Sequence, residues 1–393
     1  MREKNRANAD ESEKFFYECE NLRFMVISQS KYSEINYPNI VETTFNIPTH
    51  MKPIYFSVAI AILMSGCGPQ KPQTEETSNE EASKPKVVER LDPAIDKLID
   101  KDAKLEILGE GYTWAEGPVW VPSQQMVLFT DVPNNVAYKW KEGEGVSVFL
   151  KPSGYTAEAG KEEREPGANG LILDEEGRLL LCQHGDRRVA RMDAPMDAPA
   201  SKFVTLVDRF EDKRLNSPND LILSSWGDIY FTDPPYGLTG LDASPIKEIL
   251  FNGVYRLKKS GEIELVTDKM SKPNGIALSP DEKTLYVANS DPERSIWMSF
   301  PVNEDGSVGD GKVFFDATEL TKVMPGNPDG MKVDSKGNIF ATGSGGVVVL
   351  SPSGKHLGTI ITGAPTANIA FAGDDKVVFI TSESRLLRMK LRD

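Results

Sequence analysis

The stretch 273-PNGIALSPDEKTLYVAN-289 places an amide, Asn274, just before a short apolar run, a tight turn and a second apolar run. The same order, an acid or an amide followed by two apolar runs around a turn, occurs six times in the chain. Such units, about fifty residues apart, are typical of four-stranded blades, whereas helical repeats would show a periodicity of about 3.6 residues that is missing here. The repeat predicts an all-β fold, a six-bladed β-propeller. The units begin at Glu116, Asn169, Asn219, Asn274, Asp329 and Asn368, at intervals of 53, 50, 55, 55 and 39 residues.

The repeated acid or amide takes one equivalent position in every unit. In a propeller the equivalent positions of all blades point toward one central channel, so six oxygen-bearing side chains from distant segments are expected to converge on the axis. Converging carboxylate and amide oxygens are the ligands that hard cations prefer. The repeat therefore predicts a cation site in the channel.

The apolar runs also indicate how the blades pack. They are continuous rather than alternating, so both faces of each strand must be covered, as when a blade lies between two neighbours. The last unit is short, because only 25 residues follow Asn368. We expect the segment 104–109 (KLEILG) to supply its missing strand and close the ring. The clearest runs are Leu179–Leu181, Ile229–Phe231, Leu285–Val287 and Val347–Leu350.

Composition restricts the class of partner. The 393 residues carry a net charge of -14 and show no basic stripe. Nucleic-acid backbones are bound by clustered Lys and Arg, so nucleic acid is excluded as a partner. Of the three cysteines, Cys182 stands alone in an apolar run of the predicted propeller. It is expected to be a small core residue, and no disulfide is expected there.

The segment 51–67 (MKPIYFSVAIAILMSGC) combines a basic residue, an apolar stretch and small residues before a cysteine. It resembles a bacterial lipoprotein signal, in which cleavage precedes the cysteine and the thiol is acylated. The resemblance implies a signal peptide at 51–66 and a lipid on Cys67, with residues 1–50 a mis-called leader. Residues 67–90 are too polar to bury a core and are predicted to form a flexible tether, followed by the propeller at 91–393. The protein is therefore expected to be exported and lipid-anchored to a bacterial membrane, in the periplasm or at the cell surface.

Several motifs within the predicted propeller occur in a fixed order. They are EGPVW at Glu116, SPNDL at Ser217, FTDPPYG at Phe231, GVYRL at Gly253, PNGIALSPDEKTLYV at Pro273 and NPDGM at Asn327. Together they resemble the gluconolactonase, senescence-marker-protein-30 and luciferin-regenerating-enzyme family over residues 105–393. The resemblance implies a six-bladed propeller with one divalent metal, usually Ca²⁺, at the top of the channel. It also implies hydrolysis of sugar lactones or related esters.

The family's metal ligands, carried over to this sequence, fall on Glu116, Asn274 and Asp329. Asn219 takes either a further ligand position or one that faces the substrate. Two carboxylates with one or two amide oxygens form an all-oxygen shell without thiolate or imidazole, which suits Ca²⁺. The resemblance therefore implies Ca²⁺ first, with Mg²⁺, Mn²⁺ or Zn²⁺ as alternatives.

Proton transfer has three candidates. The family resemblance favours Asp329, but a carboxylate bound to a cation is a weak base, which favours His184 or Asp233 on physical grounds. His184 follows the second apolar run of the second unit, and Asp233 and Tyr236 take the corresponding place in the third. Asp233 could alternatively cap a turn that its neighbouring prolines enforce. Tyr236 is a candidate for substrate binding.

The activity that these residues imply is hydrolysis of a lactone, such as gluconolactone, by metal-activated water. Asn169 is expected to contact the substrate, although Asn169 and Asn368 could equally be turn residues. The absence of a G-x-S-x-G motif argues against a covalent serine mechanism. One alternative is a non-catalytic, calcium-stabilised propeller that binds a sugar or a protein at the cell surface, and another is an aryl-ester or phosphotriester hydrolase. The partner is expected to be a lactone or sugar acid, and the protein a monomer or weak dimer.

Overall fold

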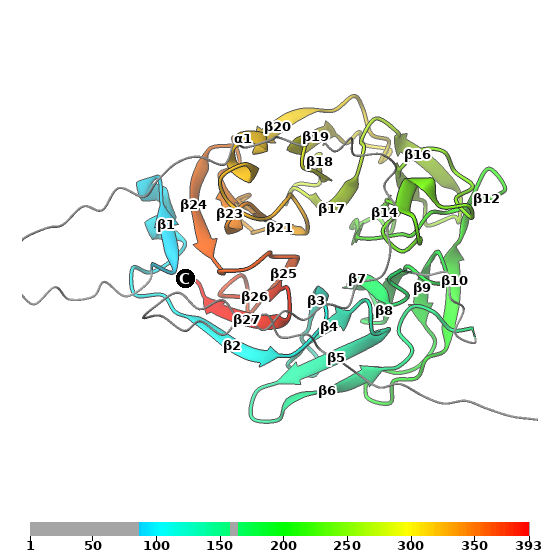
Figure 1. Ribbon diagram of the computed structural model, residues 1–393, viewed down its shortest axis with the longest axis horizontal. Coiled ribbons are helices and arrows are strands. Elements are labelled where there is room, and N and C mark those ends of the chain that lie inside the picture. The colour runs from blue at the N-terminus through cyan, green and yellow to red at the C-terminus, as the bar shows by residue number, and fades with distance from the viewer. Residues whose placement is uncertain (1–85, 158–163, 393) are drawn as a thin grey trace, which may run out of the picture. The chain divides into compact units, whose positions relative to one another are not determined.

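A computed structural model describes residues 86–157 and 164–392, and within them six antiparallel sheets stand around a central axis (Figure 1). The predicted all-β, six-bladed propeller is confirmed. Blades 1 and 2 are β3 (Ala115–Val121), β4 (Met126–Asp131), β5 (Val136–Lys141) and β6 (Gly145–Leu150), then β7 (Ala168–Leu173), β8 (Leu179–Gln183), β9 (Arg188–Met192) and β10 (Phe203–Val207). Blades 3 and 4 are β13 (Leu221–Leu223), β14 (Ile229–Asp233), β15 (Gly253–Leu257) and β16 (Ile263–Thr267), then β17 (Pro273–Leu278), β18 (Thr284–Asp291), β19 (Arg294–Pro301) and β20 (Lys312–Asp316).

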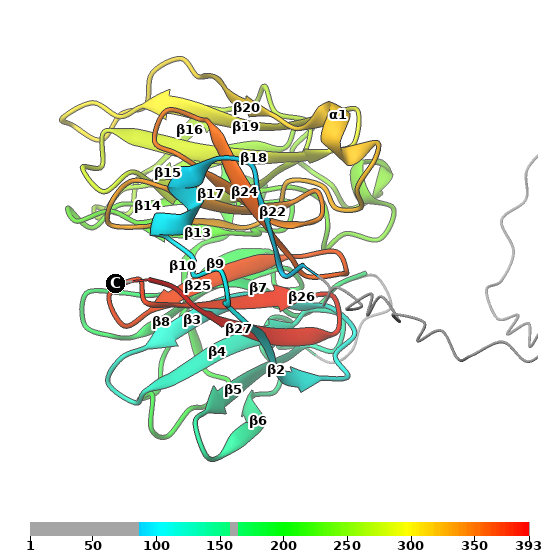
Figure 2. The same cartoon turned by 90° about the vertical axis from the view of Figure 1, so that its left-hand side faces the viewer.

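Blade 6 closes the ring with a strand from the other end of the propeller. It contains β25 (Asn368–Ala372), β26 (Val377–Ser382) and β27 (Arg385–Lys390), and its outer strand is β2 (Leu105–Glu110). β2 pairs antiparallel with β27, with Leu105 opposite Met389, and the two strands lie side by side in both ribbon views (Figure 2). The closure predicted for segment 104–109 is confirmed.

Blade 5 carries a fifth strand that the sequence did not suggest. Beside β21 (Met331–Val333), β22 (Ile339–Gly343), β23 (Gly346–Leu350) and β24 (His356–Ile361) lies β1 (Val88–Arg90), with Val88 opposite Ile360. Val88 packs against Ile95 of the following 3-10 helix η1 (Pro93–Lys97) and the core beneath it. The domain boundary predicted at residue 91 is therefore too late, because the backbone of β1 pairs with blade 5.

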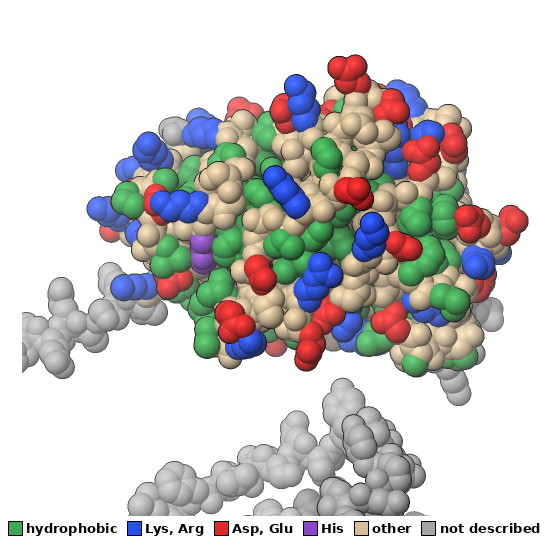
Figure 3. Space-filling model, turned by 90° about the horizontal axis from the view of Figure 1, so that it is seen from above, with side chains coloured by type: hydrophobic (Ala, Val, Ile, Leu, Met, Phe, Trp, Pro, Cys, Tyr) green, Lys and Arg blue, Asp and Glu red, His purple; other side chains and the backbone are tan. Residues whose placement is uncertain are grey.

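The remaining N-terminal predictions, namely the leader 1–50, the signal peptide 51–66 and the lipid on Cys67, lie outside the described residues. Within the described ranges, no helix is long and apolar enough to cross a membrane. The short elements outside the blades are β11 (Arg209–Phe210), β12 (Lys213–Arg214), the 3-10 helix η2 (Leu241–Ala243) and α1 (Thr318–Thr321). On the side of the propeller shown in Figure 3, basic side chains are interspersed with acidic ones and form no stripe.

The hydrophobic core consists of six clusters, each shared by two blades that are neighbours in the ring. Cys182, for example, is fully buried with Leu180 of blade 2 against Phe231 and Tyr255 of blade 3, as predicted for a core cysteine. Burial between two blades explains why the strands are apolar on both faces. The inner strands are thereby held close to the axis, where the site lies.

Glycines bring neighbouring inner strands into close approach. A Cβ added at Gly117 would lie 1.9 Å from the carbonyl oxygen of Asn169, and one at Gly275 would lie 2.2 Å from that of Asp329. Threonine hydroxyls also donate to carbonyls of the next blade, from Thr130 to Asn169 at 3.1 Å and from Thr232 to Asn274 at 2.7 Å. The glycine that follows Glu116 and Asn274 in the repeat is thus required by packing at the axis.

Candidate functional site

Side chains from blades that are not neighbours meet at the axis of the propeller. The amide of Asn368, in blade 6, donates to Asp220 at the start of blade 3, with 3.3 Å between nitrogen and oxygen. The ammonium of Lys332, in blade 5, lies 3.9 Å from the same carboxylate and 3.5 Å from the Asn368 amide oxygen. These contacts span the channel, so the repeated positions converge there.

Two carboxylates and an amide form what we call the axial cluster: Glu116, Asn274 and Asp329. Glu116 lies in β3 and is 3% exposed, and Asp329 lies two residues before β21. Burial raises the pKa of Glu116 to about 8. Burial, followed by the charge of Glu116, also raises the pKa of Asp329 well above its usual range. Within the described ranges neither carboxylate forms an ion pair, so no cation offsets the cost of ionising them in this buried place.

Asn274 connects this pair to a phenol at the channel mouth. Its side chain hydrogen-bonds Asp329 and Tyr236, and Tyr236 also hydrogen-bonds Ser290 in β18. Burial raises the pKa of Tyr236, so the phenol keeps its proton at neutral pH. The structure thus brings Asn274, Asp329 and Tyr236 together, and leaves Tyr236 with a hydroxyl that can contact a substrate.

The two other predicted amides differ in how far their groups are satisfied. Asn219 is 2% exposed, and its backbone links blades 2 and 3 by accepting from Gly170 at 2.8 Å and donating to Thr232 at 2.8 Å. The amide oxygen of Asn169 is buried and has no hydrogen-bond partner among the described residues. An unpaired buried oxygen is costly unless a ligand or a water fills the space before it. Asn169 therefore presents a free oxygen at the axis, as a substrate or ion contact requires.

His184 and a carboxylate that the sequence did not single out, Glu165, lie at the same end of the channel. The Nδ1 atom of His184 is 3.8 Å from an oxygen of Glu165, and neither ring nitrogen has a hydrogen-bond partner among the described residues. Burial lowers the pKa of His184 to about 3 and raises that of Glu165. Glu165 is close enough to raise the pKa values of Glu116 and Asp329 as well.

Asp220 is the second carboxylate that sequence reasoning missed. It adds to the raised pKa values of Glu116 and Asp329, and one of its oxygens accepts from the backbone of Leu221 at 2.9 Å. Lys332 and Asn368 contact its other oxygen. No sequence signal marked it, because successive side chains of a strand point to opposite faces and Asp220 directly follows the repeated position Asn219.

Asp233 lies in a different group of buried polar residues. Its oxygen accepts from the backbone of Asn216 at 2.7 Å, and its charged neighbours are Arg187 and Lys247. Burial raises the pKa of Asp233 to about 7. The Arg187 guanidinium in turn donates to the carbonyl oxygens of Leu215 and Asn216. The structure therefore places Asp233 against the segment at Asn216 and not in the axial cluster, and the hydrogen bonds to its carboxylate come from that segment instead of the turn that follows it.

The residues at the axis fit a hard cation in one particular way. No group of three or more His, Cys, Asp and Glu side chains in ranges 86–157 and 164–392 is arranged to hold a metal ion. A site at the axial cluster must therefore combine its two carboxylates with neutral oxygens. The unpaired carboxylates of Glu116 and Asp329, together with the amide of Asn274 beside Asp329, meet that requirement. This donor set suits Ca²⁺ better than Zn²⁺, which prefers thiolate and imidazole.

Comparisons with known proteins agree with this architecture. A family model described as the SMP-30/Gluconolactonase/LRE-like region matches residues 114–384. The gluconolactonase of Zymomonas mobilis is 38% identical over 315 residues, which cover 78% of this chain and 86% of that protein. Pentonolactonase XacC of Haloferax volcanii is 25% identical over 263 residues, or 66% of this chain and 78% of the relative. The solved structure of a gluconolactonase of Xanthomonas campestris is 32% identical and superposes with a TM-score of 0.66, covering 77% of this chain and 94% of that one.

Proposed function

The chain belongs to the SMP-30/gluconolactonase/LRE-like family, and from that premise we propose that it hydrolyses an aldonolactone, such as gluconolactone, at the axial cluster. Its relatives named gluconolactonase and pentonolactonase support a lactone hydrolase. Hydrolysis opens the ring by adding water across the bond between the carbonyl carbon and the ring oxygen. The product is the open-chain hydroxy acid.

The observation that carries the proposal is the convergence of two buried carboxylates, Glu116 and Asp329, that form no ion pair among the described residues. Two buried carboxylates that face each other without a cation destabilise the ionised state, and a divalent cation removes that cost. We propose Ca²⁺ as this ion, held by Glu116, Asn274 and Asp329 with Asn219 as a further ligand or a substrate contact. Mg²⁺ or Mn²⁺ would use the same oxygen donors.

The bound cation would supply Lewis acidity toward the lactone carbonyl. The chain's own residues perform the remaining tasks. Tyr236, whose pKa is raised by burial, is a donor to a substrate oxygen at the mouth. The unpartnered amide oxygen of Asn169 is an acceptor for a substrate hydroxyl. Donor and acceptor are both held by their blades before substrate arrives, which favours a fixed orientation of the ring.

The test is release of acid from a panel containing gluconolactone, another aldonolactone, an aryl ester and a phosphotriester, with Ca²⁺ and with a chelator. We expect calcium-dependent turnover of the aldonolactones. Glu116→Gln and Asp329→Asn should lower both calcium affinity and turnover, and excess Ca²⁺ should restore part of any loss caused by weak binding. A protein that binds Ca²⁺ but hydrolyses nothing in the panel is instead the sugar- or protein-binding propeller.

We propose, in addition, that the protein is exported and carries a lipid on Cys67, which motivates a separate test. Its support is the segment 51–67 alone, which resembles a lipoprotein signal. Expressed in a bacterium, the mature chain should begin at Cys67 and partition into detergent, and Cys67→Ser should abolish lipid attachment. Recovery of a soluble, unprocessed chain from the wild-type gene would contradict the proposal.

A further inference from the structure

One carboxylate near the axial cluster has no assigned task. Glu116 and Asp329 are the proposed ligands, and Asp220 is occupied by Lys332 and by the Asn368 amide. Glu165 is not in the ligand set, and its side chain is 17% exposed, whereas Glu116 is 3% exposed. One of its oxygens pairs with the Arg164 guanidinium at 2.9 Å, and the side chain remains partly open to a reactant near the cluster.

Backbone hydrogen bonds to three blades fix the segment that carries Glu165. Arg164 donates to the carbonyl of Gly237 in the β14–β15 connection at 3.0 Å. Gly167 donates to Val132 of blade 1 at 2.8 Å and accepts from the backbone of His184 of blade 2 at 3.2 Å. Glu165 is therefore held in a defined place before substrate binds, as a group that acts in a transition state requires.

His184 borders this carboxylate and is closely packed on another side. A Cβ added at Gly237 would lie 2.8 Å from the Cβ of His184, so the β14–β15 connection packs tightly against the ring. The imidazole is fully buried, and its Nδ1 lies 3.8 Å from an oxygen of Glu165. It cannot reach a substrate, but it borders the carboxylate and excludes water from that side.

We propose that Glu165 is the general base of the lactone hydrolysis proposed above, with His184 as its positioning residue; the assignment rests on that proposed function. As the water oxygen bonds to the lactone carbonyl carbon, one water proton passes to the Glu165 carboxylate. When the bond from that carbon to the ring oxygen breaks, Glu165 returns the proton to the ring oxygen. The product is the open-chain hydroxy acid, and Glu165 ends the cycle ionised.

The electrostatic surroundings of Glu165 agree with this role. Arg164 faces it from its own segment, His184 from the end of β8 and Tyr236 from the β14–β15 connection, while Glu116 and Asp329 face it from β3 and the approach to β21. Burial raises the pKa of Glu165, and Arg164 opposes that rise. A carboxylate with a raised pKa that is not a metal ligand is a stronger base than the two proposed ligands would be with a cation bound.

The first experiment uses Glu165→Gln, which keeps the shape and removes the base. We expect kcat to fall by roughly 10² to 10⁴, the usual contribution of a general base, with calcium affinity by titration calorimetry and the melting temperature unchanged. Glu165→Asp should restore part of kcat and keep the acid limb of its pH profile. The matched control is Glu176→Gln, because Glu176 also belongs to blade 2 and also pairs with an arginine, Arg178 at 2.7 Å, but is exposed on a hairpin turn.

His184→Gln separates positioning from packing. If His184 positions Glu165, the acid limb of the kcat profile should shift, whereas a packing role alone would lower the melting temperature and leave that limb in place. An unchanged kcat in Glu165→Gln, or a fall that follows a loss of calcium affinity, would overturn the assignment. If the wild-type protein is active and Glu165→Gln gives either of these results, only the assignment of Glu165 is wrong. If the calcium-loaded wild-type protein is inactive, the proposed function is wrong as well.

Discussion

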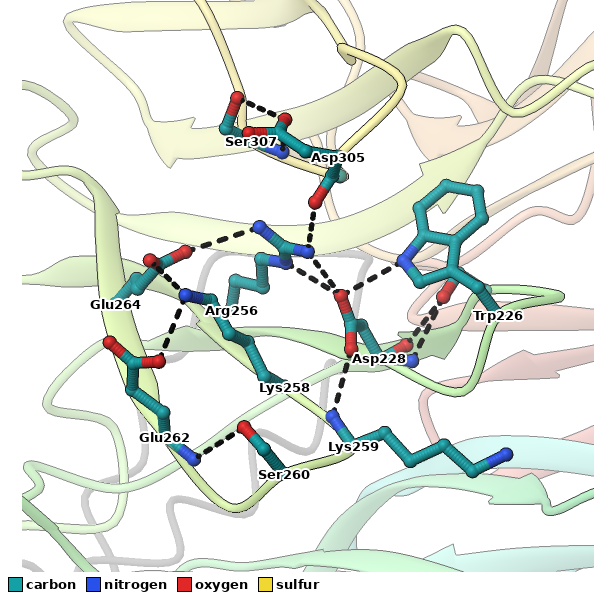
Figure 4. Close-up of polar contacts among 12 residues, drawn as sticks. Trp226, Asp228, Arg256, Lys258, Lys259, Ser260, Glu262, Glu264, Asp305 and Ser307 are labelled. Carbon is teal, nitrogen blue, oxygen red and sulfur yellow. Dashed lines mark hydrogen bonds and ion pairs between the residues drawn. The ribbon is translucent and has the colours of Figure 1, made fainter.

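Two groups of charged side chains in this propeller differ in whether the chain itself supplies a cation to the buried carboxylates. The first is the axial cluster of Glu116, Asn274 and Asp329. The second, which we call the Arg256 cluster, comprises Trp226, Asp228, Arg256 and Glu264 on blade 3 (Figure 4). The guanidinium of Arg256 lies 2.5 Å from Asp228 and 3.2 Å from Glu264. The side chain of Arg256 is only 7% exposed, and that of Asp228 is 6% exposed. Here the chain supplies its own cation.

The two groups therefore shift carboxylate pKa values in opposite directions. Burial opposes ionisation of Asp228, but bonds from the Lys259 backbone, Arg256 and the Trp226 indole together hold its pKa below the usual range. In the axial cluster burial raises the pKa of Glu116 to about 8, and among the described residues no ammonium or guanidinium pairs with this carboxylate. Burial of an acid is common to both groups, so the missing cation is what distinguishes a site from a structural contact.

The Arg256 cluster also has an evident structural task. Arg256 donates to the carbonyl of Asp305 at 2.5 Å, and the Tyr230 hydroxyl donates to the carbonyl of Gly306 at 2.6 Å. Both bonds tie blade 3 to the loop between β19 and β20 of blade 4. The charged groups of Asp228 and Arg256 thus pair with each other and help join two blades, so neither is unpaired and ready for a ligand.

The largest expected effect is on folding, from removing the cation of the Arg256 cluster. Arg256→Met leaves the buried Asp228 unpaired, and breaking a buried pair in this way costs about 3–5 kcal/mol. Lys258→Met is the matched control, because Lys258 directly follows the same strand and is a more exposed cation, which pairs with Glu262 at 3.0 Å and Glu264 at 2.5 Å. That loss should cost less than about 1 kcal/mol. Denaturant unfolding measures both, and equal losses would contradict the contrast.

Supplying the cation that the axial cluster lacks should have the next largest effect. Ca²⁺ that binds only the folded protein should stabilise it by about 2.7 kcal/mol at a free concentration of one hundred times the dissociation constant. Arg256→Met should retain this gain, because its defect lies at another site. Calorimetric melting with and without a chelator is the measurement. A melting temperature that does not respond to Ca²⁺ in the wild-type protein would refute the cation site.

The repeat made the fold and part of the axial cluster predictable. Glu116, Asn274 and Asp329 each begin a unit, so their convergence follows from the propeller symmetry. Ring closure was predictable as well, since the last unit was a strand short and a nearby apolar segment was unassigned. By contrast, β1 has only three residues, and its partner strand lies about 270 positions later, so no local pattern indicates the pairing.

The residues that the sequence did not place lie outside the repeat. Glu165 falls between two units, and it reaches the axis only because backbone bonds join its segment to Gly237 and Val132. Asp233 occupies a repeated position at the end of β14, but the chain near Asn216 turns back and donates to its carboxylate. Such irregular connections depend on contacts between distant segments, which periodicity cannot report.

The pH dependence of stability should separate the two charged groups next. In metal-free protein, folded Glu116 with a pKa of about 8 holds a proton that the unfolded chain, with an ordinary value of 4.5, releases. The contribution of Glu116 to stability is therefore fully present below its unfolded pKa of 4.5. It is lost as pH rises toward and through its folded pKa of about 8. His184 acts in the opposite sense, and its effect fades as pH rises above its ordinary pKa of 6.5. From there to pH 8 we expect a loss of about 2 kcal/mol.

Calcium provides the control for that measurement. Asp233 also has a raised pKa, but it lies outside the axial cluster and contributes equally with and without the metal. A bound cation keeps Glu116 and Asp329 ionised, so the loss between pH 6.5 and 8 should shrink in saturating Ca²⁺. Denaturant unfolding at several pH values, with chelator and with calcium, gives both curves. Parallel curves would show that the carboxylates at the axis do not hold the ion.

The smallest expected effect has the opposite sign to the usual result of mutating a buried polar residue. In the metal-free protein at pH 8, Glu116→Gln replaces a buried unpaired charge by a neutral amide of the same shape, so it should stabilise the fold by about 1 kcal/mol. In saturating Ca²⁺ the same change should destabilise it, because a ligand is lost. The corresponding change in the Arg256 cluster, Asp228→Asn, should destabilise under both conditions, since it leaves the Arg256 guanidinium without its partner. If Glu116→Gln instead destabilises the metal-free protein at pH 8 as Asp228→Asn does, the axial carboxylates are compensated by the chain itself, and the distinction between the two groups fails.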